Sequence, residues 1–439
     1  MSEQAQQDSA RSSDLSDKYI PGGVSSINRI VSPSIAFERG DGAYMWDEDG
    51  KKYLDFHAAF APHLLGHCHD AINDAVIAAI KNHKSLFGSG PTDLEGELAA
   101  LLCTEIDALE KVTLLNTGSE ATALAVKLSR AVTGRSHFIV MQGGYNGNSD
   151  EVACNVFNSL EEIGPRVSPG EYPVKPLGAG TLIEQQGLVH VVNFNDLASV
   201  RYVCEKYPVA AVLTEPVLQN VGVIKPDDGY LSGLRSLADE LGFLLIIDEV
   251  KTGFRQGVGG YAAASNVRPD LVTYGKAVAN GFPIGMLGGK AEYMDWIAAK
   301  DPSKRPLVAG TYNGHPVAVS AAIATVSLLK NQGAEIFAHL EHLGRRAEEG
   351  IQNIFKAKDI KGCVARVGSA FSFYFMDHRP RDFHDMLTNH DFDRDVELRR
   401  KLIAEGVYFV PIATKQCSIS AAHTEQDIDF MLDRFEHIL

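Results

Sequence analysis

Short apolar runs that recur between helical segments constrain the fold of this chain more than any other feature of its sequence. Each run holds four or five almost uninterrupted apolar residues, and amphipathic stretches such as 231–241 separate them. A strand without alternating polar residues is buried on both faces, which is typical of a mostly parallel sheet covered by helices. The predicted strands are 112–115, 137–141, 209–213, 243–247, 271–274 and 284–288. We therefore predict an α/β fold for the middle of the chain.

The two ends of the chain follow another pattern. Apolar residues flank the turn dipeptide Asp49-Gly50, so residues 43–56 are predicted to form a hairpin. In the last third, apolar residues at helical spacing through 336–354 predict one long amphipathic helix. Strands near Val364, at 371–375 and at 407–410, a helix at 396–405 and a final helix with the capping box Thr424/Asp427 follow. This C-terminal part is predicted to be a separate α+β unit.

These patterns predict four parts of the 439-residue chain. They are a flexible polar tail at 1–17, an N-terminal segment at 18–65, a large domain at 66–312 and a C-terminal α+β domain at 313–439.

Charge and cysteine content exclude several classes of protein. The 56 acidic residues outnumber the 41 basic ones and give a net charge of −15, which disfavours binding to nucleic acid or to anionic membranes. The longest apolar stretch, 317–329, is too short to span a bilayer, and the polar N-terminus lacks the apolar core of a secretory signal. The six cysteines are scattered without a C-x-x-C motif, so we expect a reducing, cytoplasmic location.

A histidine-rich turn has spacing similar to that of a metal site. His63, His67, Cys68 and His69 lie within seven residues, but no clear carboxylate or second cluster accompanies them. We expect a turn and a helix cap there, and no bound metal.

Four other segments share one chemistry. Residues 116–121 follow a strand and open a helix, whose free N–H groups and dipole make an anion site to which Ser119 adds a hydroxyl. Tyr145 lies on a glycine-rich loop after the next strand, where an aromatic ring could stack on a planar ligand. Asp248 ends a buried strand, at the edge where α/β sheets bind ligands.

Lys276 completes the set. It follows the buried strand 271–274 among small residues, so desolvation is expected to lower its pKa and make its amine a nucleophile that forms Schiff bases. A phosphate site, a stacking aromatic ring, a carboxylate for a ring nitrogen and a buried lysine are together what pyridoxal phosphate requires.

These residues lie in segments that resemble the class III aminotransferases of the fold type I pyridoxal-phosphate enzymes, in particular the branch that contains glutamate-1-semialdehyde aminomutase. The matching segments are PGGVSSINR (21–29), NTGSEA (116–121), GGYNGNSD (143–150), EPVLQN (215–220), DEVKTGFR (248–255), YGKAVANGFPIG (274–285) and AGTYNGHP (309–316). The resemblance covers nearly the whole chain from Pro21. It implies a large domain with a mostly parallel central sheet, and a smaller α+β domain formed by the N- and C-terminal segments.

The resemblance also implies a role for each matching residue. Lys276 would hold pyridoxal 5'-phosphate as a Schiff base, and Asp248 would pair with the protonated ring nitrogen. Tyr145 would stack on one face of the ring and Val250 would cover the other. Asn220 would reach the phenolic oxygen of the ring.

The remaining implied roles concern the phosphate and the substrate. Gly118 and Ser119 would bind the phosphate, and Thr311 would reach the phosphate of a neighbouring subunit, which implies a homodimer with shared active sites. Arg29 would hold a substrate carboxylate, a task that suits its bidentate fork.

Three departures from the mutase pattern fall around the expected substrate pocket. Lys415 stands at the position of the active-site glutamate of the mutase, Phe60 replaces a tryptophan, and Asn146-Gly147-Asn148 replaces a His-Gly-His sequence. We therefore expect an unchanged cofactor and a changed substrate.

The sequence thus predicts an aminotransferase that moves an amino group from an amine or amino acid to a keto acid. A 2,1-aminomutase and an amino-acid racemase or epimerase share the same cofactor chemistry and remain alternatives. A catalytically silent homologue is disfavoured, because Lys276, Asp248 and Tyr145 are intact.

Overall fold

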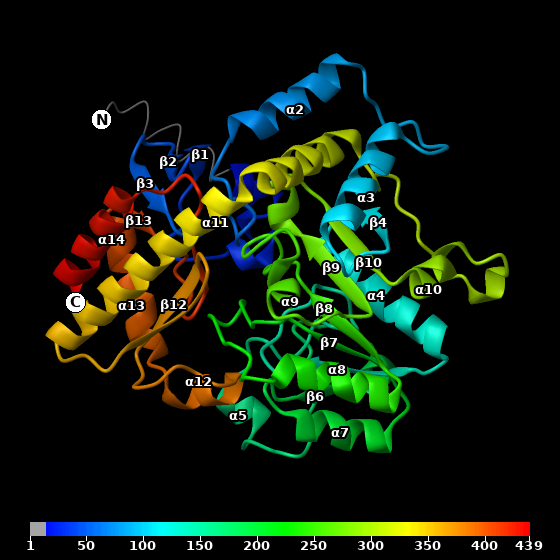
Figure 1. Cartoon of the computed structure of the whole chain (residues 1–439). Helices are drawn as coiled ribbons and strands as arrows, with labels where there is room; N and C mark the ends of the chain where they lie inside the picture. The colour runs from blue at the N-terminus through cyan, green and yellow to red at the C-terminus, as the bar shows by residue number, and fades with distance from the viewer. Residues whose placement is uncertain (1–14) are drawn as a thin grey trace. The chain divides into compact units, whose positions relative to one another are not determined.

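The computed structural model describes residues 15–439, which fold into two compact units (Figure 1). The large unit comprises residues 70–338 and 379–390. The small unit comprises the described residues up to His69 together with 339–378 and 391–439. Among residues 15–439, no helix combines the length and the apolar character that crossing a membrane requires.

A seven-stranded sheet in the order β4-β10-β9-β8-β7-β5-β6 forms the centre of the large unit. All of its strands run parallel except β10, which is antiparallel to both β4 and β9, so the predicted mostly parallel sheet is confirmed. The strands are β4 (Lys111–Leu115), β5 (His137–Met141), β6 (Val189–Val192), β7 (Val209–Thr214), β8 (Leu244–Asp248), β9 (Leu271–Gly275) and β10 (Gly285–Gly289). The strand β6 was not among those predicted.

Helices cover this sheet because its strands are apolar on both faces: every residue of β7, β8 and β9 is buried. The helix α4 packs on β10, β9 and β7, and α8 packs on β8 beside α7 (Figure 1). The longer helices of the unit are α2 (Asp70–Lys81), α3 (Asp93–Glu105), α4 (Gly118–Thr133), α7 (Leu197–Lys206) and α8 (Tyr230–Leu241).

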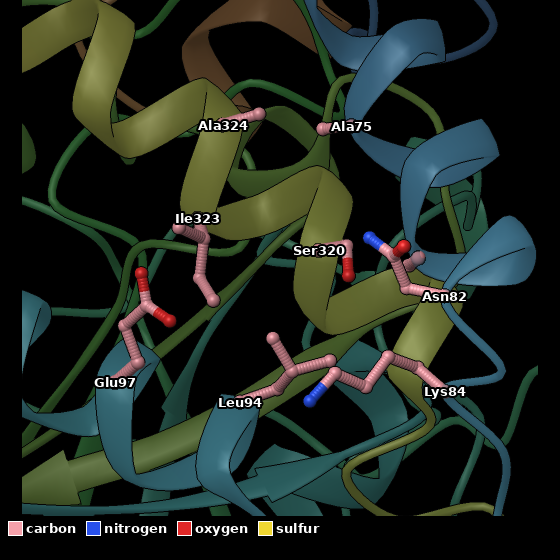
Figure 2. A pocket seen from close by; sticks show the side chains of 9 residues that line it. Ala75, Asn82, Lys84, Leu94, Glu97, Ser320, Ile323 and Ala324 are labelled. Atoms are coloured by element: carbon pink, nitrogen blue, oxygen red, sulfur yellow. The ribbon is translucent and has the colours of Figure 1, made fainter.

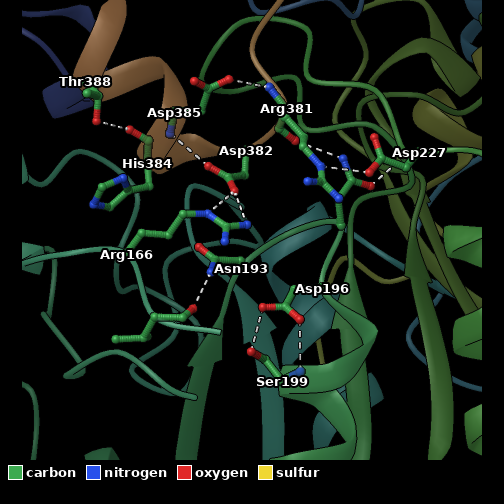
Figure 3. Close-up of polar contacts among 12 residues, drawn as sticks. Arg166, Asn193, Asp196, Ser199, Asp227, Arg381, Asp382, His384, Asp385 and Thr388 are labelled. Carbon is green, nitrogen blue, oxygen red and sulfur yellow. Dashed lines mark hydrogen bonds and ion pairs between the residues drawn. The ribbon is translucent and has the colours of Figure 1, made fainter. Parts of the chain in front are cut away.

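A short segment of the last third returns to the large unit and ends in helix α12 (Phe383–Asn389). Asp382 caps this helix by accepting from Asp385 N at 2.8 Å, and it also accepts from Arg166 Nε and Nη2 at 3.0 and 2.9 Å (Figure 3). A Cβ atom added at Gly143 would lie 2.7 Å from Phe383 Cβ. The returning segment therefore packs directly against the loop that follows β5.

The small unit contains two smaller sheets. The strands β1 (Phe37–Asp41), β2 (Tyr44–Asp47) and β3 (Lys52–Asp55) are antiparallel neighbours, and β13 (Val407–Tyr408) pairs in parallel with β3. This confirms the predicted hairpin. The second sheet is β11 (Cys363–Val367), β12 (Ala370–Tyr374) and β14 (Cys417–Ser418), and the helices are α13 (Phe392–Ala404) and α14 (Glu425–Ile438), the latter with the predicted capping box.

The predicted domain limits and the observed units differ mainly in two places: residues 379–390 belong to the large unit although they were predicted in the C-terminal domain, and the boundary predicted at 313 falls further along the chain. The helix α11 (Pro316–Ala357) passes from one unit to the other without a break, and the change falls between Ala338 and His339, whereas the sequence suggested residue 313. A continuous helix leaves no turn signal in the sequence, so the loop before Pro316 was the only local cue. Most of the predicted tail, 1–17, lies outside the described residues.

Candidate active site

Five loops meet at one edge of the large sheet, where its parallel strands end. In an α/β sheet this carboxyl edge is the usual place for a ligand, because the loops there converge. The segments are Asn116–Ser119 after β4, Gln142–Asn148 after β5, Glu215–Asn220 after β7, Asp248–Val250 at the end of β8, and Lys276 after β9. The large unit thus brings together the residues predicted to contact the ring of the cofactor and its phosphate, except Thr311.

Asp248 is buried at this edge, with 3% of its surface exposed. Three donors hold its carboxylate: Asn146 Nδ2 at 2.8 Å, Val250 N at 3.0 Å and Thr273 Oγ1 at 2.9 Å. Desolvation raises the pKa of Asp248, although these hydrogen bonds and the charge of Lys276 oppose the rise. The carboxylate is fixed in orientation, and a cation placed next to it would compensate its burial.

Lys276 follows β9 in a left-handed backbone conformation, with φ at 46°. Non-glycine residues rarely adopt this conformation, and where they do the surrounding structure must hold them in place. Desolvation lowers the pKa of Lys276, as expected from the sequence, and the carboxylates of Asp248 and Glu215 oppose this effect. The amine is therefore easier to deprotonate than that of a solvated lysine.

The amino terminus of α4 forms a narrow cradle. A Cβ atom on Gly118 would lie 2.6 Å from Val250 Cγ1, and one on Gly285 would lie 2.1 Å from the carbonyl oxygen of Thr117. The side chain of Thr117 caps the helix by accepting from Glu120 N at 3.2 Å, while Ser119 Oγ accepts from Asn148 N at 3.2 Å. Glycine is thus required where the helix starts, and its N–H groups are suited to an anion.

The loop after β5 is tied to its neighbours on both sides. Tyr145 N donates to Glu215 Oε1 at 3.0 Å, and the Asn146 side chain donates to Asp248. Thr122 Oγ1 donates to the carbonyl oxygen of Asn146 at 2.5 Å. The ring of Tyr145 is partly buried, and burial raises its pKa.

Two residues of this edge escaped the sequence analysis as site members. Asn146 was noted only as a departure from the mutase pattern, yet it orients Asp248. Glu215 lies in a matching segment and accepts from Tyr145 N, from Gln219 N at 3.1 Å and from Asn220 Nδ2 at 3.3 Å. Burial raises the pKa of Glu215 to about 7. Its position directly after an apolar strand was the available signal.

Thr311 is exposed on the loop that precedes α11 in the large unit. Asn313, two residues further on, accepts from Asn116 Nδ2 at 2.9 Å, so this loop lies beside the loop that follows β4.

The predicted substrate residues lie in the small unit. Arg29 and Phe60 both line a cavity of about 300 Å³. The rest of its wall is mostly apolar and comprises Val24, Asn28, Val31, Ser34, Ile35, Phe37, Met45, His57, Ala59, Tyr408 and Val410.

Lys415 is only 6% exposed, which excludes a fully solvated side chain for this lysine. A buried ion pair holds its segment. Arg399 Nε donates to Asp395 Oδ1 at 2.6 Å, Arg399 Nη2 donates to the carbonyl oxygen of Lys415 at 3.0 Å, and Asp395 Oδ2 accepts from Thr414 N at 2.6 Å.

A second cavity of about 310 Å³ lies in the large unit between α2, α3 and the start of α11 (Figure 2). Its wall combines small apolar side chains with Asn82, Lys84 and Glu97, and it contains none of the predicted site residues. Within the described part of the chain, no group of three His, Cys, Asp or Glu side chains is arranged to hold a metal ion.

The residues at the carboxyl edge of the large sheet are of the types that pyridoxal phosphate requires. A lysine of lowered pKa, an oriented buried carboxylate, a helix amino terminus and an aromatic side chain occupy adjacent loops, and the glycine at Gly118 leaves room where a Cβ would collide with Val250. The fold and this edge together define a fold type I pyridoxal-phosphate enzyme.

The chain belongs to the class-III aminotransferase family, whose model matches residues 26–439. It is 35% identical over 431 residues to a glutamate-1-semialdehyde 2,1-aminomutase of Nitrosospira multiformis, covering 96% of this chain and 97% of that protein. Its structure is similar to an ω-transaminase from Sphaerobacter thermophilus (TM-score 0.88, 27% identity, 98% and 96% of the two chains). It is also similar to a transaminase with PLP bound (TM-score 0.84, 27% identity, 98% and 96%). The protein is a pyridoxal-phosphate-dependent aminotransferase.

Proposed function

We propose that this enzyme transfers an amino group from an amine or amino acid donor to a separate keto acid, and that it is not a mutase. The observation that carries this choice is the buried Lys415 at the position of the mutase glutamate. At ~4 Å and an effective dielectric of ~20, each unit of charge changed at this position alters the energy of a neighbouring charge by about 4 kcal/mol at most. A cationic diamine, which the mutase must retain, would be disfavoured accordingly.

Lys276 and Asp248 are proposed to carry the chemistry. When bound, pyridoxal phosphate supplies an electrophilic carbon and an electron sink. Lys276 would provide the amine that holds the cofactor, and the same amine would then carry a proton to or from the substrate carbon. The lowered pKa of this lysine favours both tasks. Asp248, oriented by three hydrogen bonds, keeps the ring nitrogen protonated.

The remaining residues at this edge are proposed to bind and orient the cofactor. The N–H groups at Gly118 and Ser119 would receive the phosphate, since they open α4. Tyr145 and Val250 would enclose the ring, and Asn220 would hold its phenolic oxygen.

The substrate site is proposed to take a carboxylate that bears a compact apolar group. Arg29 would hold the carboxylate, and the apolar wall of the 300 Å³ cavity, including Phe60, would take the rest of the molecule. Lys415 would hold a second anionic or polar group.

We also propose a homodimer in the cytoplasm. Thr311 would complete the phosphate site of the partner subunit. The large unit exposes several large hydrophobic side chains, as expected of a surface that a second copy covers: Ile77, Ile80, Phe87, Leu307 and Tyr312. Sedimentation that finds an active monomer at working concentration would reject the dimer.

The aminomutase is the second candidate, because the curated relative described above carries that name. The two functions differ in their need for an acceptor. We expect negligible conversion of glutamate-1-semialdehyde to 5-aminolevulinate, and measurable transfer from at least one donor in a panel of amines and amino acids to pyruvate or 2-oxoglutarate. Efficient isomerisation without an added keto acid would restore the mutase.

A further inference from the structure

Four consecutive residues of the small unit, Ala58–Ala61, adopt left-handed backbone angles although none of them is glycine. Their φ values are 49°, 52°, 66° and 84°. L-amino acids disfavour this conformation because Cβ approaches the following carbonyl oxygen. A run of such residues persists only where the surrounding structure holds it.

Asp55, at the end of β3, supplies that hold. Its side chain is 2% exposed, and its Oδ1 accepts from His57 N at 2.7 Å and from Ala58 N at 3.0 Å, at the start of the turn. Its Oδ2 lies 2.8 Å from His67 Nε2, at the other side of the turn. Ala61 N also donates to the carbonyl oxygen of His57 at 3.3 Å. One buried carboxylate therefore joins both sides of the left-handed turn.

His67 is itself fixed in orientation. A Cβ atom on Gly40 would lie 2.7 Å from His67 Nδ1, so the ring packs directly against the backbone of β1. Burial raises the pKa of Asp55, but the hydrogen bond from His67 and the charges of His67 and His57 outweigh it and lower the pKa overall. The carboxylate consequently remains ionised and able to accept from all of its donors.

The turn forms one wall of the substrate cavity. His57, Ala59 and Phe60 line the same cavity as Arg29. The Phe60 ring meets the His57 ring edge to face, with centroids 4.2 Å apart. A change in the backbone of the turn would displace Phe60 relative to the rest of the wall.

We propose that Asp55 and His67 are positioning residues that hold the turn 58–61, and thereby set how Phe60 closes the cavity around a carboxylate bound by Arg29. This inference rests on the proposed function, in which Arg29 and Phe60 contact the substrate. Neither Asp55 nor His67 lines the cavity, so the pair acts on substrate affinity through the turn.

The first test is Asp55→Asn in the holoenzyme, assayed with the best carboxylate-bearing donor of the panel. Asparagine keeps the shape but replaces one acceptor oxygen by a donor, so it cannot accept from both sides of the turn. We expect KM to rise about tenfold while kcat changes less than roughly threefold. The visible absorption of the bound cofactor and its pH dependence should not change. A KM of Asp55→Asn equal to that of the wild type would overturn the proposal.

A mutant cycle with Phe60→Ala tests the route of the effect. If Asp55 acts through Phe60, adding Asp55→Asn to Phe60→Ala should raise KM no further. If Asp55→Asn raised KM by the same factor in the wild type and in Phe60→Ala, the proposal would be overturned. Ala59→Gly provides a rescue, since glycine adopts a positive φ without strain. In the Asp55→Asn background it should restore at least part of the lost affinity, and a complete lack of rescue would count against the turn as the intermediary.

Two controls keep the test decisive. Thr424→Ala removes the cap of α14 in the same unit, and we expect a lower Tm with an unchanged KM. If Asp55→Asn fails to fold, His67→Leu replaces it, because leucine fills similar space but offers no donor to Asp55, and KM should still rise. A KM unchanged in folded His67→Leu overturns the proposal. Arg29→Ala distinguishes failure of the proposed function from failure of this inference. An unchanged KM in Arg29→Ala refutes the substrate role of Arg29. A raised KM in Arg29→Ala, together with an unchanged KM in Asp55→Asn, refutes this inference alone.

Discussion

The residues assigned to the cofactor and those assigned to the substrate lie in different units and are held in different ways. The residues assigned to the cofactor lie on loops at the ends of buried parallel strands, where the sheet fixes the backbone. The residues assigned to the substrate lie in irregular segments: Arg29 in a 3-10 turn (Ile27–Arg29), Phe60 in a left-handed turn, and Lys415 between two short strands. Regular structure holds the proposed cofactor site, and local side-chain contacts hold the proposed substrate site.

The buried carboxylates of the two units show the same contrast. Burial raises the pKa values of Asp248 and Glu249 at the sheet edge. In the small unit, His67 lowers the pKa of the equally buried Asp55. The first pair is costly to ionise, because burial outweighs the hydrogen bonds and the charge of Lys276 that stabilise the ionised Asp248, and a protonated ring nitrogen beside Asp248 would compensate the rest. The second is already compensated by the protein and serves its structure.

The largest expected effect is that of Lys276→Ala, since the proposed role requires the amine of this lysine. Turnover should be lost entirely, while folding and weak cofactor binding remain. Borohydride reduction of the wild-type protein should abolish its yellow colour and label Lys276, as mass spectrometry of a digest can determine. Full activity of the variant would mean that Lys276 does not carry the proposed chemistry.

Asp248→Asn comes second. Removing one member of a buried charge pair costs about 3–5 kcal/mol, or roughly two to four decades in rate. Because desolvation opposes ionisation of Asp248, the apoprotein should keep its Tm or gain slightly. Thr273→Val, which removes one of three donors, is the matched control and should lose much less. Only a minor loss of rate for Asp248→Asn would mean that this aspartate has a structural role alone.

Much of the fold, and the meeting of the proposed cofactor residues at one sheet edge, was predictable from sequence. Apolar runs gave the strands of the large sheet, and a charged residue at the end of such a run, as with Asp248 and Lys276, is costly enough to indicate chemistry. Asn146 was not recognised as a partner of Asp248, because the two residues are far apart in sequence and an amide on a loop has no distinctive pattern.

The structure around the proposed substrate residues was harder to predict from the sequence, for a physical reason. Nothing in the sequence His57-Ala-Ala-Phe-Ala61 indicates a left-handed turn, since alanine normally favours right-handed helix and the cause is the tertiary contact between Asp55 and His67. The backbone at Lys415 is likewise held by the ion pair Asp395–Arg399, which the sequence shows only as an ordinary i, i+4 pair. The boundary between the two units, which falls inside α11, gave no turn signal in the sequence either.

The pH dependence of stability gives the third prediction. Glu249 is fully buried, and burial raises its pKa from 4.5 to about 7. Between these two values the unfolded chain releases a proton that the folded chain keeps, so wild-type stability falls as pH rises from about 5 to about 7, by up to about 3 kcal/mol. Glu249→Gln should gain Tm over the wild type progressively across this window, and no further above it. A constant difference from pH 5 to pH 8 would contradict the raised pKa.

The smallest effect expected is that of Arg29→Lys, and it tests the substrate half of the comparison. Lysine keeps the charge but loses the planar fork, so one of two charge-assisted hydrogen bonds to a carboxylate is lost. Loss of this hydrogen bond costs about 1.5 kcal/mol, so KM for a carboxylate-bearing donor should rise about tenfold with little change in kcat. A donor with a methyl group in place of the carboxylate should be unaffected, which makes it the internal control. Equal losses for both donors would mean that Arg29 supports the fold of the small unit and does not bind the carboxylate.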